Sequence, residues 1–283
     1  MSSELPRTGL RINFLPILLA LAAAGLIFVK GCQEGPFGRM QVVGMNPEQE
    51  ARLGAQSFQE VLNESDVVTS GQNVETVQRV GKRIAAAAER SDVMEHLHLA
   101  IPKFQWEFRL VRNKQVNAFC LPGGKVVVYT GILPVAENET GLATVMGHEV
   151  GHALAHHGAE RMAQQRLVQL GQTAVAGSID NLSPQQRMQV FAVLGLGSKF
   201  GILLPFSRKH ESEADHIGII LMAAAGYDPK ESVAFWQRMA RVGGSAPPEY
   251  ASTHPSHETR IADLKKWIPE AEPFYQKSRS RER

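Results

Sequence analysis

Apolar side chains recur every three or four residues in six stretches of the chain, which is the spacing of helices that bury one face. The six stretches are residues 47–62, 74–90, 139–166, 183–196, 211–225 and 229–241. Residues 104–110 instead alternate between apolar and polar, and residues 125–129 form a β-branched run after a Pro-Gly-Gly turn, so both are predicted strands. The pattern therefore predicts an α+β fold that is mainly helical and carries a small sheet.

The N-terminal part of the chain has a different pattern. Residues 12–29 are apolar except for Asn13, and they reach the length of about 18 residues that marks a candidate membrane span. We expect an uncleaved transmembrane or signal-anchor helix; a cleaved signal peptide and a lipoprotein anchored at Cys32 are the alternatives. The expected organisation is a short N-terminal segment (1–11), the anchor (12–29), a linker (30–46), one compact domain (47–275) and a basic tail (276–283).

Charge and cysteine content narrow the function classes. The net charge is +2, and the Lys and Arg residues are dispersed, so no nucleic-acid partner is expected. Two cysteines, Cys32 and Cys120, make no disulfide framework.

The segment from His148 to His152 carries the sequence HEVGH, and it lies inside a predicted helix that begins after Asn138. Histidines four residues apart share one helix face, and Glu149 lies about 100° around the helix from His148. Two imidazoles with a neighbouring carboxylate can hold zinc and activate water. The alternative is a pair of ordinary histidines on a core or surface helix.

Two glycines, Gly147 and Gly151, lie beside these histidines. Each costs a helix interior about 1 kcal/mol relative to alanine. We therefore expect the backbone of another element to pack closely against this helix.

A catalytic zinc site needs a third protein ligand and an open fourth position. A histidine six residues after His152 is excluded, because Gly158 occupies that position, and His156 and His157 are better suited to supporting or substrate-facing roles. Glu211 and Asp215 share one face of a later predicted helix, so one of them can bind the metal while the other orients a ligand imidazole. Glu213 points away from that face and is expected to be a solvated carboxylate.

Four motifs together resemble one known family. HEVGHALAHHGAER, SRKHESEADHIG, NAFCLPGGKVVVYTGIL and STHPSHETRI, in residues 47–267, are similar to the membrane-associated gluzincin peptidases, which include HtpX, the CAAX prenyl proteases, the Oma-type proteases and the BepA and LoiP types. The resemblance is greatest to the Oma, BepA and LoiP-like branch, without a tetratricopeptide domain. It implies a zincin-like metalloprotease domain.

The resemblance also implies roles for individual residues. His148, His152 and Glu211 would bind one Zn²⁺ per chain, and Glu149 would be the general base. The remaining members of the implied site are Asp215, which would orient a ligand histidine, His157, which would support the site, His254, which would approach the metal or the developing oxyanion, and Arg260, which would be structural. A turn residue ahead of Pro255 is the alternative role for His254.

The strand at residues 125–129 is the expected substrate strand. An exposed strand beside the metal would let an extended peptide add to the sheet through main-chain hydrogen bonds. Gly124, Val126 and Val128 are the expected substrate-binding positions. The alternative is a strand buried within the core sheet.

The leading functional hypothesis is a membrane-anchored zinc endopeptidase that hydrolyses misfolded or membrane-associated envelope proteins. The expected location is the bacterial inner membrane, with a single span and the catalytic domain on the periplasmic side, because Arg7 and Arg11 precede the apolar segment. A different class is an envelope chaperone or scaffold with a regulatory zinc site and little proteolysis. A third is a zinc hydrolase of another amide, such as that of peptidoglycan.

Overall fold

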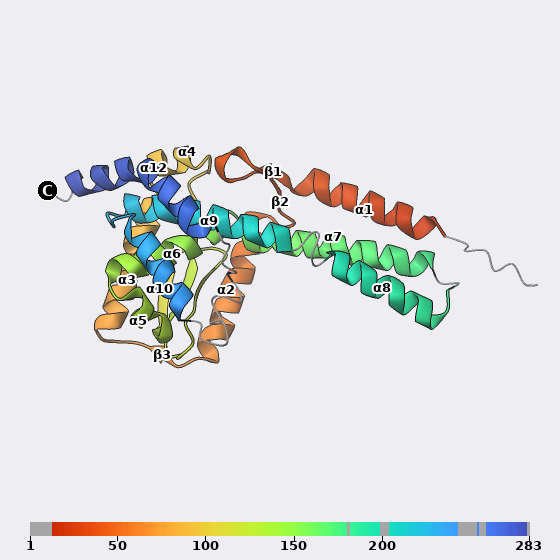
Figure 1. The fold of residues 1–283 in the computed structure, drawn as a ribbon, viewed down its shortest axis with the longest axis horizontal. Coiled ribbons are helices and arrows are strands. Elements are labelled where there is room, and N and C mark those ends of the chain that lie inside the picture. Colours follow the sequence, from red (N-terminus) through yellow and green to blue (C-terminus); the bar gives the residue numbers. More distant parts are fainter. Residues whose placement is uncertain (1–12, 180–181, 199–203, 243–253, 255–258, 282–283) are drawn as a thin grey trace, which may run out of the picture.

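The structure is a computed structural model of the chain that describes residues 13–179, 182–198, 204–242, 254 and 259–281. The expected N-terminal segment 1–11 lies outside the described residues. Figure 1 shows a part that contains both helices and strands, which we call the head. A long arm of helices extends from one side of the head. The C-terminal end lies on the opposite side of the head from the arm.

The head contains a four-stranded sheet in the order β3-β4-β6-β5. The strands are β3 (Val67–Val68), β4 (Glu107–Val111), β5 (Ala118–Leu121) and β6 (Lys125–Tyr129). β4 pairs with β6 in parallel, while the β3–β4 and β5–β6 pairs are antiparallel. The two strands that the sequence predicts are therefore neighbours.

β6 lies inside the sheet, which corrects the expectation that it is an exposed strand and agrees with the alternative of a strand within the core sheet. It is hydrogen-bonded to β4 on one side and to β5 on the other, and Val126 and Val128 are fully buried. Gly124 precedes this strand with a positive φ of 85°, and its carbonyl oxygen already accepts a hydrogen bond from the Glu107 N–H at 3.0 Å. β5 is instead the edge strand on the side that contacts α6. A continuous β-branched run is typical of a strand that is buried on both faces.

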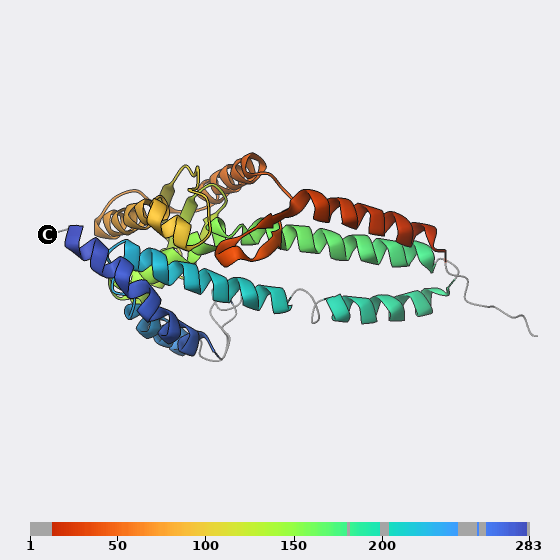
Figure 2. The same ribbon diagram turned by 90° about the horizontal axis from the view of Figure 1, so that it is seen from above.

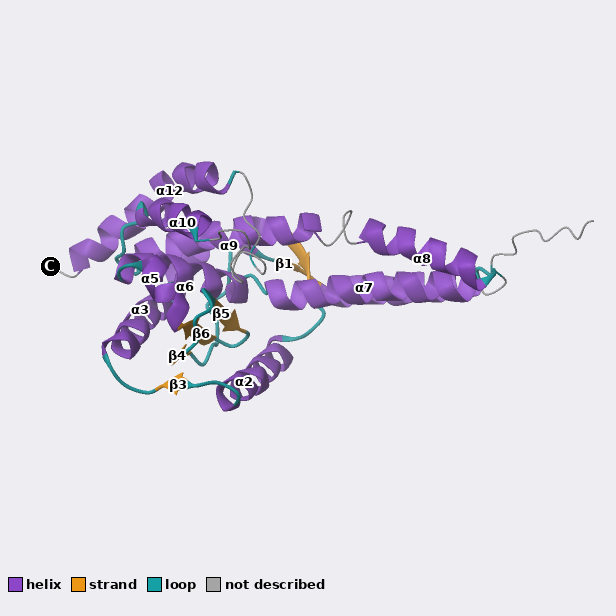
Figure 3. Cartoon of the chain, turned by 60° about the horizontal axis from the view of Figure 1, so that its bottom comes forward, coloured by secondary structure: helices purple, strands orange, loops and turns teal. Residues whose placement is uncertain are grey.

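The sheet lies between two layers of helix. Val126 and Val128 join the large core with the helices of one face, whereas Val127 packs with Phe58 on the opposite face. Figure 3 shows α2 on one side of the sheet and α3 with α6 on the other. These helices are α2 (Pro47–Asn63), α3 (Gln72–Ala88) and α6 (Glu139–Leu154).

Further helices complete the head. They are α4 (Ser91–His96), α5 (Leu133–Ala136), α9 (Leu204–Ala224), α10 (Glu231–Arg241) and α12 (Arg260–Arg281), with a 3-10 turn, η2 (Thr130–Ile132), before α5. The prediction of a mainly helical α+β fold with a small sheet is confirmed. α12 continues through most of the expected basic tail, and Lys277 forms an ion pair with Asp92 there.

α6 and α9 pack against each other at very short range, as the two glycines of α6 predict. A Cβ built on Gly147 would lie 2.8 Å from the carbonyl oxygen of Gly218, and one built on Gly151 would lie 2.9 Å from that of Ala214. Side chains larger than hydrogen would separate the two helices. This contact brings the two segments that carry the predicted metal ligands together.

The stretch at 139–166 forms two helices, where the periodicity predicts one. α6 ends at Leu154, and α7 (His157–Ser178) begins after His156, which adopts a left-handed conformation with φ 54°. The side chain of His156 is hydrogen-bonded to Glu50 of α2 across 2.8 Å. The apolar spacing continues through both helices, so periodicity alone does not reveal the change in direction.

The helical arm consists of α1 (Leu15–Gly31), α7 and α8 (Pro184–Ser198). α1 lies alongside α7, as Figures 1 and 2 show. Within the described part of the chain, no helix combines the length and the apolar character needed to cross a bilayer. The expected transmembrane anchor at residues 12–29 is therefore not supported.

Residues 30–46, expected to be a linker, contain a small hairpin that we call the N-terminal hairpin. β1 (Cys32–Glu34) pairs in antiparallel fashion with β2 (Met40–Val42), and the turn between them includes a 3-10 segment, η1 (Pro36–Gly38). Phe37 in this turn stacks on His216 of α9, with 4.2 Å between the ring centroids. The hairpin thereby connects α1 to the head.

Candidate metal centre

Two histidines of α6 form the base of the site. The helix begins at a capped end, because the Asn138 side chain accepts a hydrogen bond from the Gly141 N–H at 2.9 Å. One turn apart and both buried, His148 and His152 lie with 3.1 Å between their Nε2 atoms. Two imidazole nitrogens this close are well placed to bind the same cation once neither carries a proton.

α9 brings a carboxylate to the same point. The oxygens of Glu211 lie 3.4 Å from the Nε2 atoms of His148 and His152, and the side chain is fully buried. With His254, these residues form a group whose possible ligand atoms all lie within 4.8 Å of one another. Imidazole nitrogens together with one carboxylate are a ligand set that zinc commonly takes in proteins. The structure therefore brings the three predicted ligands together.

A neighbouring carboxylate orients His148. Its Nδ1 lies 2.8 Å from Asp215, which also accepts a hydrogen bond from Arg260 Nε at 2.6 Å. Because an ionised carboxylate only accepts, His148 Nδ1 donates to Asp215, and Nε2 is the nitrogen that would bind a metal once it has lost its own proton. This is the role that the family resemblance implies for Asp215, whereas its spacing with Glu211 left open which of the two carboxylates would orient the imidazole.

His152 is oriented differently, through a second histidine. Its Nδ1 lies 2.8 Å from His157 Nδ1, and His157 Nε2 lies 2.8 Å from a carboxylate oxygen of Glu213. Glu213 is therefore no solvated carboxylate, which corrects the sequence-based expectation. It faces away from Glu211 on α9, toward α7, and it reaches the metal centre through His157.

The expected general base, Glu149, and His254 lie next to each other beside the three predicted ligands. Glu149 is almost completely buried, and its carboxylate is 3.7 Å from His254 Nε2. His254 Nδ1 is 3.2 Å from both oxygens of Glu211. His254 therefore contacts a ligand and the expected base at once. Its neighbours 252–253 and 255–258 lie outside the described residues.

Arg260 supports the site from beneath. It donates to Glu211 at 3.0 Å and to Asp215, and its guanidinium lies 3.8 Å from the ring centre of Trp236. Only 2% of the residue is exposed. A buried guanidinium that binds two carboxylates fits the structural role implied for it and fixes the start of α12.

The pKa values follow from burial and from these partners. Burial by itself lowers the pKa of His148, but Asp215 and Glu211 outweigh it and raise the value to about 10. Burial lowers the pKa of His152 to about 3 and that of His157 well below 6.5. Burial would raise the pKa of Glu211, yet hydrogen bonds from the surrounding imidazoles lower it. The carboxylate is thus ionised and available to a cation.

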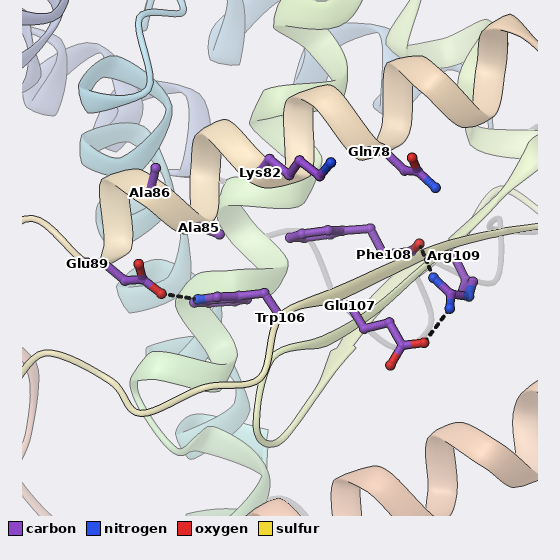
Figure 4. Close-up of a pocket in the computed structure, with 9 residues that line it drawn as sticks. All are labelled: Gln78, Lys82, Ala85, Ala86, Glu89, Trp106, Glu107, Phe108 and Arg109. Atoms are coloured by element: carbon purple, nitrogen blue, oxygen red, sulfur yellow. Dashed lines mark hydrogen bonds and ion pairs between the residues drawn. The ribbon is translucent and has the colours of Figure 1, made fainter.

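A separate pocket of about 390 Å³ lies between α3 and β4 (Figure 4). Figure 4 shows Trp106 donating to Glu89 along its wall. The pocket is lined by Gln78, Lys82, Ala85, Ala86, Glu89, Trp106, Glu107, Phe108 and Arg109. It shares no lining residue with the metal-binding group, so it is not the reaction site.

Sequence reasoning missed Glu160 and Arg39 near the centre and assigned Glu213 to solvent. Glu213, Glu160 and Arg39 form an ion-pair cluster that ends on His157. The only signal in the sequence is that Glu160 lies three residues after His157 and therefore on the same side of α7. Arg39 is far from either carboxylate in the chain and could not have been assigned.

Comparisons with known proteins agree with this geometry. The family model described as Peptidase family M48 matches residues 72–268. The chain is 40% identical over 228 residues to a protein named mitochondrial metalloendopeptidase OMA1 from Schizosaccharomyces pombe, covering 79% of this chain and 62% of that protein. It is 34% identical over 183 residues to the Escherichia coli protein named beta-barrel assembly-enhancing protease, covering 62% of this chain and 37% of that protein. The chain spans less than two thirds of the length of either relative.

Proposed function

The chain belongs to peptidase family M48, which confirms the resemblance seen in its motifs, and on that basis we propose that it is a zinc-dependent endopeptidase. The observation that carries the proposal is the buried group of His148, His152 and Glu211 with Glu149 beside it. A site that only stored a metal would not need a buried carboxylate next to the ligands.

In the proposed reaction, His148, His152 and Glu211 hold the metal and Glu149 moves the proton. Bound zinc supplies a Lewis acid that polarises a carbonyl and makes water more acidic. Glu149 takes a proton from the attacking water and delivers it to the leaving amine. Asp215 and Arg260 keep His148 and Glu211 in place during the reaction.

We assign His254 to the fourth position around the metal. Its Nδ1 lies 3.4 Å from His148 Nε2 and 3.2 Å from Glu211, so it stands where a catalytic site leaves room for water and substrate. Hydrolysis requires this side chain to withdraw from the group. In its described position Nε2 lies 3.7 Å from the Glu149 carboxylate, and an imidazole that stays on this side of the site after leaving Glu211 is suited to stabilise the oxyanion.

The proposed substrate lies along β5. This strand forms the edge of the sheet, contacts α6, and has half-buried side chains from Phe119 to Leu121. An extended peptide can pair with such an edge through its main chain, with little dependence on its sequence. Unfolded or misfolded segments present an extended main chain, which is the basis for proposing them as substrates.

The helical arm is proposed to contact a membrane surface. Several large apolar side chains of α1 are more than half exposed, namely Leu15, Leu18, Leu19, Leu21, Leu26, Phe28 and Val29. Exposed apolar side chains gathered on one helix mark an interaction surface. Membrane-associated proteins of the cell envelope, met on the periplasmic side, are the proposed substrates.

The test uses the purified full chain with an unfolded protein such as casein. We expect one zinc per chain and cleavage that a chelator abolishes. Glu149→Gln should keep its zinc and lose at least about 100-fold in rate, because general-base catalysis contributes about 10²–10⁴-fold. Glu139→Gln, the same change at the exposed start of α6, is the matched control.

Other outcomes would redirect the proposal. Full activity in Glu149→Gln would remove the assignment of the base. A protein that binds zinc and cleaves nothing, even after His254→Ala opens the fourth position, would favour a chaperone or scaffold. A wild-type chain without zinc would contradict the metal assignment itself.

A further inference from the structure

A second polar cluster lies where the N-terminal hairpin meets α7 and α9. Arg39, at the turn of the hairpin, binds two carboxylates at once. It donates to both oxygens of Glu213 at 2.9 and 2.8 Å, and to both oxygens of Glu160 at 3.0 and 2.9 Å. Both carboxylates are nearly buried, with 10% and 3% of their side chains exposed. Bidentate pairs, in which one guanidinium donates to both oxygens of a carboxylate, are among the strongest ion pairs in proteins.

The cluster is continuous with the metal centre. Glu213 accepts from His157 Nε2 at 2.8 Å, and His157 Nδ1 lies 2.8 Å from His152 Nδ1. Because Glu213 can only accept, His157 Nε2 carries the proton and its Nδ1 is the acceptor. His152 Nδ1 must then donate, and its Nε2 lone pair is left directed toward Glu211 and the metal position.

This sequence of contacts differs from the one at His148. There the orienting carboxylate, Asp215, lies on α9 and bonds to the imidazole directly. At His152 the orienting carboxylate acts through His157, and its own position depends on Arg39. Glu213 stands close to Glu160, so without the guanidinium two nearly buried carboxylates would repel each other. Arg39 thus fixes the group that determines the orientation of His152.

We propose that Arg39 is a positioning residue for the metal ligand His152, acting through Glu213 and His157, so that high zinc affinity requires the N-terminal hairpin to be seated on the head. This inference rests on the metal site of the proposed function. It adds a contribution from a segment that lies outside residues 72–268, the part matched by the family model. Any partner or surface that lifts the hairpin would weaken zinc binding without touching a ligand.

The test measures zinc affinity of the full chain by competition with a chelator, and the absorption spectrum of the Co²⁺-substituted protein. We expect Arg39→Ala and Glu213→Gln each to weaken zinc binding by about 10–100-fold, which is the usual loss for a partner of a metal-bound histidine. Both should also change the Co²⁺ spectrum. Arg39→Lys should recover only part of the zinc affinity, because an ammonium cannot form bidentate pairs with two carboxylates at once.

Arg112→Ala is the matched control, because its ion pair with Asp66 is largely exposed and away from the cluster. It should leave affinity and spectrum unchanged. Wild-type affinity and an unchanged spectrum in Arg39→Ala would overturn the inference, and Glu213→Gln decides the same question if Arg39→Ala does not fold. Absence of zinc from the wild type would instead refute the metal site, so the two failures are distinct.

Discussion

Replacing Gly147 with alanine tests whether the close contact of α6 with α9 sets the metal geometry. The added Cβ would lie 2.8 Å from the Gly218 carbonyl oxygen, whereas ordinary contact begins at 3.4 Å. The helices must therefore separate locally by about 0.6 Å (3.4 − 2.8). Metal–ligand distances tolerate deviations of only about 0.2 Å, so a shift of this size moves Glu211 out of register with the two histidines.

The expected magnitudes follow from two opposing effects. Overpacking costs about 1–3 kcal/mol, and alanine gains about 1 kcal/mol over glycine as a helix former. The free energy of unfolding of the metal-free protein should thus fall by about 0–2 kcal/mol. Zinc affinity should fall by about tenfold or more, because the ligands of the two helices no longer meet at one point.

Gly171→Ala provides the control for helix propensity. Gly171 lies in α7 and has no atom within 4 Å of its built Cβ. This variant should gain about 0.5–1 kcal/mol in stability and keep its zinc affinity. Urea denaturation and chelator competition measure both quantities. If Gly147→Ala matched Gly171→Ala in stability and in zinc affinity, the reasoning about the helix contact would be refuted.

Three further predictions concern stability. Arg260→Met should lower the free energy of unfolding by about 3–5 kcal/mol in urea denaturation, because it leaves Glu211 and Asp215 buried without their cation; a loss below about 1 kcal/mol would contradict this. Hydrogen bonds from Arg90 and Lys277 lower the pKa of Asp92 against the effect of burial, so wild type should melt above Asp92→Asn at neutral pH, with the difference shrinking as the pH falls below the ordinary value of 3.8; a difference as large at pH 2 as at pH 5 would count against the ion pair. Chelation of the zinc-loaded protein should lower the melting temperature, since free zinc at 100 times its dissociation constant stabilises by about 2.7 kcal/mol, and an unchanged calorimetric midpoint would show that the metal does not bind the folded state preferentially.

Much of the fold was accessible from local patterns. The Asn138 cap, the helical spacing of His148 and His152, and the glycines at 147 and 151 depend on residues within one or two turns of one another. Helical hydrogen bonds join residues four apart, so such features can be read without knowing the rest of the chain. The helical content was predicted for the same reason, and the two strands were predicted because alternation and β-branched runs are also local patterns.

Strand order was not accessible in this way. A β-branched run predicts a strand, but whether it lies at an edge or inside a sheet depends on which other strands pair with it. β6 is paired with β4 on one side and with β5 on the other, so it is not the free edge that the sequence-based expectation required. The break between α6 and α7 at His156 was missed as well, because a left-handed residue changes the direction of the chain without changing the apolar spacing.

The sequence by itself determined the chemistry of the site: two imidazoles, the adjacent Glu149, and the pair Glu211 and Asp215, each set by helical spacing within one element. Only the tertiary structure decided which other charged groups contact these residues. Arg39 meets Glu213 across 174 positions of the chain, and no local pattern links them. Such contacts form because the packing of hairpin, α7 and α9 buries their charges together, and burial is a property of the assembled fold.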